Sequence, residues 1–273
     1  MSHNTFLKFF ILLVMGLVVF VFANPYYRVF PTNWNQPFYI GLAVFFFALV
    51  VACYFIPVLA EYKNAAYAFL IAALALVVLK AGFFNLPMKS MSPVKELAID
   101  KLSQFLHIVP VIIVMNILSR KNLGEIFLQT GHFKPGLVFG LISFAAFAVI
   151  GYFIAAGTSD FVRSLIKALP WVLLFVFANS IMEELWFRGI FLKTFDPLVG
   201  KWGAILLTSL FFGLSHINAT YDFPGGGMIF GTVVFLLGVA GACTMYKYDS
   251  VIGPILFHAG YDLLIIVPVV QSM

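Results

Sequence analysis

Nine long apolar runs follow one another along the chain, and they constrain its fold more than any other feature. Most are near the length of about 20 residues that a helix needs to cross about 30 Å of hydrocarbon. The short segments between them hold most of the charged residues. The runs are residues 6–23, 37–59, 65–84, 102–118, 135–156, 165–191, 202–217, 227–246 and 251–270. This pattern predicts an integral, multi-pass membrane protein.

The runs are predicted to be helices rather than strands of a barrel. Strands that face a polar lumen alternate with period two, whereas residues 45–51 are apolar at every position. We therefore expect an all-α fold, a polytopic transmembrane helical bundle with eight or nine spans. The count depends on run 102–118, which contains a histidine, a proline and an asparagine and could be a short, kinked or interfacial helix. Residues 1–24 are similar to a secretory signal, and we interpret them as an uncleaved first helix.

Composition excludes several classes of function. Hydrophobic residues make up 63% of the chain and charged residues 10%, which excludes a soluble globular domain. The basic residues form no stripe along a face, so we expect no nucleic acid as a partner. Cys53 and Cys243 lie in apolar runs and form no CxxC pair, so the sequence predicts no disulfide framework.

Ionisable side chains inside three of the runs are the strongest functional signal. Such groups are costly within a bilayer, so their default interpretation is functional. An isolated intramembrane histidine often serves only as a hydrogen-bonding residue between helices, but a cluster on three of the spans favours a catalytic or ion-handling site. The six residues are Glu183, Glu184, Arg188, His216, His258 and Asp262.

The first group divides into two roles by helix geometry. Glu184 and Arg188 are four residues apart and share a helix face, so they are predicted to pair inside the bundle. Glu183 points about 100° away from that face and is predicted to be unpaired. An unpaired carboxylate in an apolar setting suits a general base. Asn179, one turn earlier, is expected to hydrogen-bond Glu183.

The other two groups repeat the spacing of four residues. Asp262 is predicted to accept a hydrogen bond from His258 and to orient it, and the ring of Phe212 is predicted to pack against His216. Lys193 and Lys201 before the first of these spans and Lys247 before the second place those loops on the cytoplasmic side. Counting about 1.5 Å per residue from that surface puts Glu183, His258 and His216 about 10–20 Å deep. The three side chains are therefore expected to meet near the middle of the bilayer.

The ordered set of motifs resembles the CPBP family of intramembrane proteases. Glu-Glu-x-x-x-Arg begins at residue 183, Phe-x-x-x-His at residue 212 and His-x-x-x-Asp at residue 258. The family includes the CAAX prenyl endopeptidases and the bacterial Abi proteins linked to bacteriocin processing and immunity. The resemblance covers roughly residues 165–270. It implies a catalytic helical core at 135–273, within one continuous membrane domain whose helices at 1–134 have no assigned role.

The resemblance also implies roles for the motif residues. Glu183 would be the general base, His216 would help to position the attacking water, and His258 would stabilise the oxyanion, with Glu184 and Arg188 in support. The sequence departs from the prenyl endopeptidases at Asp262, where they have asparagine. An ionised aspartate cannot donate to an oxyanion and would repel it. We therefore assign Asp262 to the orientation and charging of His258, and we count it among the catalytic residues with Glu183, His216 and His258.

Alternatives to a metal-independent protease remain open at this level. His216, His258 and Glu183 could hold a catalytic zinc ion, although the HExxH signature is absent and we expect no cofactor. A catalytically silent membrane scaffold or regulator and a proton-coupled transporter are the rival functions. As substrate we expect a membrane-associated peptide or protein, with or without a lipid group. We expect the protein in a bacterial or archaeal cytoplasmic membrane, with the lipid bilayer as its surroundings.

Overall fold

The computed structural model describes residues 3–24, 27, 29, 31–85, 91–155, 161–219 and 225–271. The helices that span most of this chain are α1 (His3–Leu17), α2 (Asn35–Phe55), α3 (Lys63–Ala81), α4 (Pro93–Leu118), α5 (Phe133–Ala155), α6 (Phe161–Glu183), α7 (Leu192–His216), α8 (Gly226–Tyr248) and α9 (Ile252–Gln271). Shorter π or 3-10 turns are η1 (Val18–Phe22), η3 (Thr32–Trp34), η4 (Pro57–Tyr62), η5 (Leu123–Ile126) and η6 (Glu184–Gly189). No strand occurs among these residues.

The helical bundle that the sequence predicts is confirmed. Nine helical stretches within the described ranges are long and apolar enough to cross a membrane, which matches the upper of the two expected counts. Residues 4–22 form one of them, so the first apolar run is helical as predicted. The chain is thus an integral, multi-pass membrane protein.

The fourth span is a full-length helix. The short apolar run predicted a helix from residue 102, but α4 begins at Pro93 and has 26 residues. Proline is favoured at the first position of a helix because its fixed φ suits the turn and no N–H is lost there. The ammonium of Lys95 lies 4.8 Å from the centre of the Trp171 ring, which accommodates its charge against α6. The added turns bring Lys101 inside the helix.

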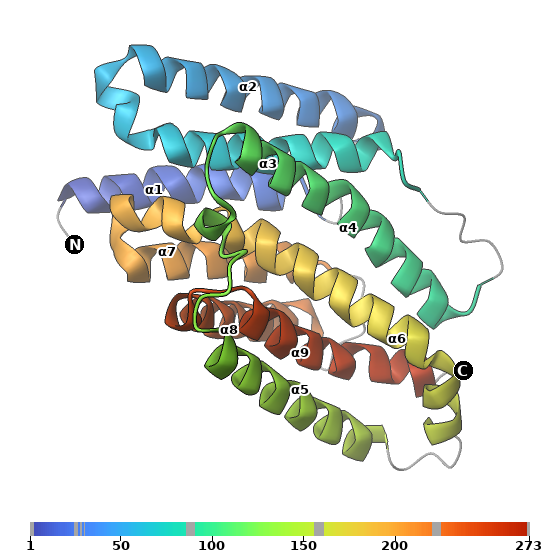
Figure 1. Cartoon of the computed structure of the whole chain (residues 1–273). Helices are drawn as coiled ribbons and strands as arrows, with labels where there is room; N and C mark the ends of the chain where they lie inside the picture. The colour runs from blue at the N-terminus through green and yellow to red at the C-terminus, as the bar shows by residue number, and fades with distance from the viewer. Residues whose placement is uncertain are drawn as a thin grey trace.

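The helices α6 and α9 lie at the centre of a continuous row of packed helices. Figure 1 shows α4, α6, α9 and α5 stacked in that order, and each neighbouring pair is in extensive contact. On the other side of the bundle, α7 packs against α8 and α1, and α3 packs against α2 and α4. The helix α4 therefore links the N-terminal helices to the predicted catalytic core, so the two halves form one packed unit.

A small residue sets the distance between α7 and α8. A Cβ atom added to Gly213 would lie 2.7 Å from the Cβ of Phe235 and 2.8 Å from the carbonyl oxygen of Gly231. Contacts this short require one residue to lack a side chain, as is common where membrane helices approach closely. The position of His216 at the end of α7 depends on this contact.

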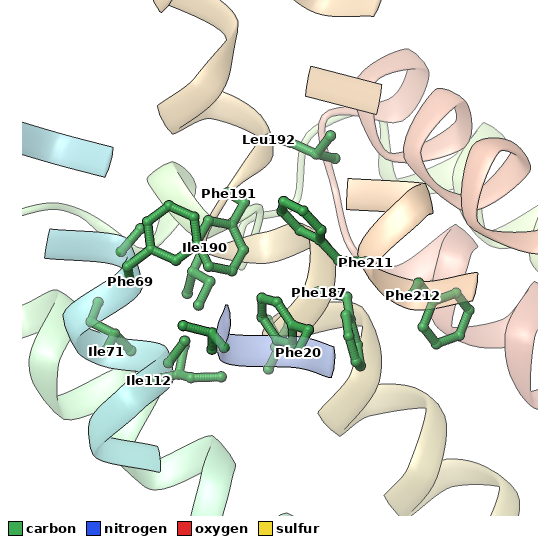
Figure 2. Close-up of a cluster of buried hydrophobic side chains, with 14 of the residues drawn as sticks. Phe20, Phe69, Ile71, Ile112, Phe187, Ile190, Phe191, Leu192, Phe211 and Phe212 are labelled. Atoms are coloured by element: carbon green, nitrogen blue, oxygen red, sulfur yellow. The ribbon is translucent and has the colours of Figure 1, made fainter. Parts of the chain in front are cut away.

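An aromatic cluster fixes the N-terminal helix to the turn that follows Glu183. Phe20 in η1 lies 4.8 Å from Phe187 and 5.5 Å from Phe211, measured between ring centres. Figure 2 shows these rings together with Phe191 and Phe69. Such pairs contribute about 0.5–1.5 kcal/mol each beyond the burial of their area. The N-terminal helix thereby supports the polypeptide on which the candidate site is built.

Candidate active site

The predicted site residues converge on one cavity. Its polar lining consists of Asn179, Glu183, His216, His258, Tyr261 and Asp262. The apolar part of the wall comes from Phe175, Phe212, Phe230, Val234, Leu237 and Ile265. Residues from α6, α7, α8 and α9 thus enclose a polar centre within an apolar wall. Their meeting inside the bundle is as predicted.

The carboxylate of Glu183 occupies the centre of the cluster. It is 5% exposed. Its Oε1 lies 3.7 Å from Nε2 of His216, and its Oε2 lies 3.6 Å from Nε2 of His258. Oε1 also lies 3.5 Å from Nζ of Lys101. The prediction that Glu183 is unpaired is therefore wrong. Its own helix provides no cation on that face, but α4 places Lys101 beside it.

Lys101 is a site residue that sequence reasoning missed. It comes from α4, outside the segment that carries the three motifs, and its side chain is 12% exposed. The apolar run begins at residue 102, which would place Lys101 at a membrane surface. The extension of α4 to Pro93 puts it within the helix instead. A lysine directly before an intramembrane run was the only signal in the sequence, and it did not indicate a partner.

His258 is oriented by Glu184. The imidazole Nδ1 lies 2.9 Å from Oε1 of Glu184, a distance at which Nδ1–H donates to the carboxylate. Oδ1 of Asp262 lies 3.6 Å from Nε2 of His258, too far for a direct hydrogen bond. The prediction that Asp262 accepts from His258 is therefore wrong, although the two groups are close enough to interact as charges. Because Glu184 holds Nδ1, Nε2 of His258 faces Glu183 and the cavity.

The predicted pair of Glu184 and Arg188 is confirmed. Nη1 of Arg188 donates to Oε1 of Glu184 at 2.5 Å, and the two side chains are 1% exposed or less. Nε of Arg188 donates to the carbonyl oxygen of Gly238 on α8, and the guanidinium lies 4.3 Å from the centre of the Phe212 ring. The pair therefore connects η6, α7 and α8 directly behind His258.

A π turn follows Glu183 and departs from the α-helical geometry assumed above. In η6, the amide of Ile190 donates to the carbonyl oxygen of Leu185, five residues earlier. Turns of this kind insert one residue into a helix and are frequent at functional sites. The widened turn still leaves Glu184 and Arg188 in contact, while Glu183 ends the regular part of α6.

His216 is held by its own helix. Its Nδ1 lies 2.8 Å from the carbonyl oxygen of Phe212, and the two rings pack edge to face with centres 4.8 Å apart. The predicted packing of Phe212 on His216 is confirmed. A carbonyl oxygen only accepts, so the hydrogen of this bond lies on Nδ1. In the neutral ring, Nε2 of His216 is then an acceptor that faces Glu183.

Asn179 contacts Asp262 rather than Glu183. Its Nδ2 donates to Oδ2 of Asp262 at 2.9 Å. The prediction that Asn179 bonds Glu183 is therefore wrong, because α9 presents a carboxylate closer to the amide than the next turn of α6 does. Through this hydrogen bond Asn179 fixes Asp262 at the edge of the cavity.

Within the described ranges, no group of three or more His, Cys, Asp or Glu side chains is arranged to hold a metal ion. The expectation that no cofactor is needed and the zinc alternative on His216, His258 and Glu183 both remain predictions.

Comparison with known proteins places the site within a family match. Residues 165–264 match the model of the family described as type II CAAX prenyl endopeptidase Rce1-like. The predicted family resemblance is confirmed over this segment. The matched segment contains all six ionisable residues of the three motifs, from Glu183 to Asp262. Lys101 lies outside it.

A curated relative supports the same assignment. The chain is 30% identical over 110 residues to the UPF0177 protein YbdI of Lactococcus lactis subsp. lactis strain IL1403. The alignment covers 40% of this chain and 55% of the relative, so the chain spans about half the length of that protein. No solved structure gives a significant match.

Proposed function

We propose that this protein is an intramembrane endopeptidase that hydrolyses a peptide bond in a membrane-associated peptide or protein. The observation that carries the proposal is the convergence of three helices on one cavity, with Nε2 of both His216 and His258 within 3.7 Å of the Glu183 carboxylate. The match of residues 165–264 to a prenyl endopeptidase family supports this reaction class.

The first step is the activation of water by Glu183 and His216. The carboxylate of Glu183 and Nε2 of neutral His216 are both acceptors and face each other across 3.7 Å. A water that donates to both acceptors turns a lone pair toward the substrate. Glu183 takes one proton as the oxygen attacks the scissile carbonyl carbon, and it later gives that proton to the leaving nitrogen.

The second step is the stabilisation of the oxyanion by His258. Three carboxylates, on Glu183, Glu184 and Asp262, are close to two cations, on Lys101 and Arg188. A proton on His258 brings this buried set of charges to neutrality, which lowers its cost in an apolar medium. With Nδ1 bound to Glu184, a protonated His258 presents Nε2–H to the cavity as the donor for the oxyanion.

The remaining polar groups support these two steps. Glu184 and Arg188 hold His258 from behind, and Lys101 compensates the charge of Glu183. Asp262 adds negative charge near His258 and is held by Asn179. In this scheme the protein acts without a metal ion, and the substrate reaches the cavity from the membrane, with or without a lipid group.

The test is the cleavage of a panel of membrane peptides with prenylated and unprenylated C-termini by protein purified in detergent. Wild type is compared with Glu183→Gln, Glu183→Ala and His216→Ala, with and without a chelator. Glu96→Gln is the matched control, because Glu96 is an exposed carboxylate in the first turn of α4.

We expect cleavage by wild type and Glu96→Gln that is unaffected by chelator, and loss of cleavage of at least about 100-fold in each site variant. Inhibition by chelator that zinc reverses would replace the water mechanism with a metal site on His216, His258 and Glu183. Equal cleavage by wild type and Glu183→Gln would refute the proposal.

A further inference from the structure

Tyr261 is a polar residue of the cavity to which the proposed mechanism gives no role. It lies on α9 directly before Asp262, is 8% exposed and lines the same cavity as Glu183. Its hydroxyl is buried and has no hydrogen-bond partner among the described residues. Buried polar groups in proteins are almost always paired, so an unpaired one requires an explanation.

Two other tyrosines, the buried Tyr39 and the half-buried Tyr67, have the ordinary structural arrangement. The hydroxyl of Tyr39 donates to the carbonyl oxygen of Ala23, and that of Tyr67 donates to the carbonyl oxygen of Met115. Each of these hydroxyls joins two helical segments. The hydroxyl of Tyr261 has no such partner among the described residues. A structural hydrogen bond therefore does not account for its presence in the cavity wall.

The ring of Tyr261 is fixed by close packing between α9 and α5. A Cβ atom added to the preceding Gly260 would lie 2.8 Å from the Cα of Phe144, so the two backbones are nearly in contact. The ring packs edge to face on Phe147, with centres 6.1 Å apart. A side chain on a helix held in this way presents its polar atom at a defined place, as a preorganised site requires.

The cavity is rich in acceptors and poor in donors. Glu183 and Asp262 are carboxylates, and one of the two N–H groups of Asn179 Nδ2 is bound to Asp262. Nε2 of His216 is an acceptor in the tautomer set by its helix carbonyl. Beside protonated His258, the hydroxyl of Tyr261 is a donor that has no partner among the described lining residues.

We propose that the hydroxyl of Tyr261 donates a hydrogen bond to the scissile carbonyl oxygen and, with His258, forms the oxyanion site. The substrate class is therefore a peptide carbonyl that enters the cavity with its oxygen toward α9. This role supplies the second donor that Asp262 cannot provide while ionised. It also explains the unpaired hydroxyl, which finds its partner only when substrate is bound. The proposal rests on the proposed peptidase function.

The test is Tyr261→Phe, which removes the hydroxyl and keeps the ring. The probe is the peptide of the panel above that the wild type cleaves fastest. We expect kcat to fall by about 100-fold, the magnitude typical for the loss of one oxyanion donor, with KM changed less than about threefold. We also expect no loss of thermal stability in detergent, because the hydroxyl has no partner in the free protein. The control is Tyr67→Phe, which removes a paired hydroxyl outside the cavity and should lower stability while kcat is unchanged.

Each outcome separates this proposal from the one on which it rests. Wild-type kcat in Tyr261→Phe, with Glu183→Gln inactive, would overturn the role of Tyr261 and leave the peptidase function intact. A loss of stability in Tyr261→Phe as large as that in Tyr67→Phe would show a structural hydroxyl and overturn the role as well. If Glu183→Gln cleaves as well as wild type, the peptidase function fails, and the role of Tyr261 fails with it.

Discussion

Replacement of Arg188 by methionine tests the buried ion pair behind the candidate site. Arg188 is fully buried and donates to Glu184 at 2.5 Å and to the carbonyl oxygen of Gly238 at 3.2 Å. Methionine fills much of the same volume and removes the charge. The carboxylate of Glu184, which is 1% exposed, then has no cation beside it except a protonated His258.

The expected loss of stability follows from these contacts. Removal of one partner of a buried ion pair costs about 3–5 kcal/mol, because the other charge remains in an apolar setting. The lost hydrogen bond to Gly238 adds about 1 kcal/mol. We therefore expect Arg188→Met to lower the free energy of unfolding by about 4–6 kcal/mol. Arg188→Lys keeps the charge and one donor but loses one hydrogen bond. We therefore expect it to lower the free energy of unfolding by only about 1 kcal/mol.

A double variant shows whether the charge of Glu184 is the cause. Glu184→Gln keeps an oxygen that accepts from Nδ1 of His258 but carries no charge. If the uncompensated carboxylate causes most of the loss of stability in Arg188→Met, Glu184→Gln combined with Arg188→Met should be at least about 2 kcal/mol more stable than Arg188→Met alone.

The measurement is unfolding of the detergent-purified protein by titration with SDS, followed by circular dichroism. A cost below about 1 kcal/mol for Arg188→Met, or a double variant no more stable than the single one, would refute the reasoning.

Three further predictions follow from single contacts. Lys101→Met should lower cleavage at least about tenfold, because Glu183 loses the cation 3.5 Å away, and Lys101→Arg should restore most of it; equal activity in all three proteins would contradict this. Asp262→Asn should keep the fold and much of the activity, because an amide oxygen accepts the same hydrogen bond and the amide adds a donor; near-complete inactivation of a folded variant would show that the charge is required. Gly213→Ala should lower stability by about 1–3 kcal/mol, because its Cβ would lie 2.8 Å from a carbonyl oxygen of α8. The control is Gly41→Ala, whose Cβ would meet nothing within 4 Å and which should be neutral. The melting temperatures of the two variants in detergent provide the comparison.

The contacts that the sequence predicted correctly are local ones. Glu184 with Arg188 and Phe212 with His216 are each four residues apart, and helical geometry alone brings such residues together. The contacts predicted wrongly also had this spacing but lost to a partner from another helix. Asn179 bonds Asp262 instead of Glu183, and His258 bonds Glu184 instead of Asp262. Helical periodicity shows which residues share a face. It does not show whether a side chain from another helix lies closer than the neighbour on the same helix.

The N-terminal half illustrates a second limit. Hydropathy predicted an α4 that begins after Lys101, because four charged residues at 95–101 lower the mean hydropathy of the segment before residue 102. In the folded protein α4 continues to Pro93, and contacts with α6 provide a polar partner for the lysine inside the bundle. The exclusion of a charge from lipid does not apply to a charge that faces another helix.

The sequence by itself determined that the chain is a bundle of membrane helices and predicted that six ionisable residues on three of them gather at one site. It could do so because apolar length and the cost of charge in a bilayer are properties of each segment alone. The tertiary structure decided which of these groups touch: Lys101 at Glu183, Glu184 at His258, and the unpaired hydroxyl of Tyr261 in the same cavity. These contacts depend on the rotation and spacing of helices, which are fixed by close packing at residues such as Gly213 and by the π turn after Glu183. Packing of this kind is a property of pairs of helices, so no single segment of the sequence contains it.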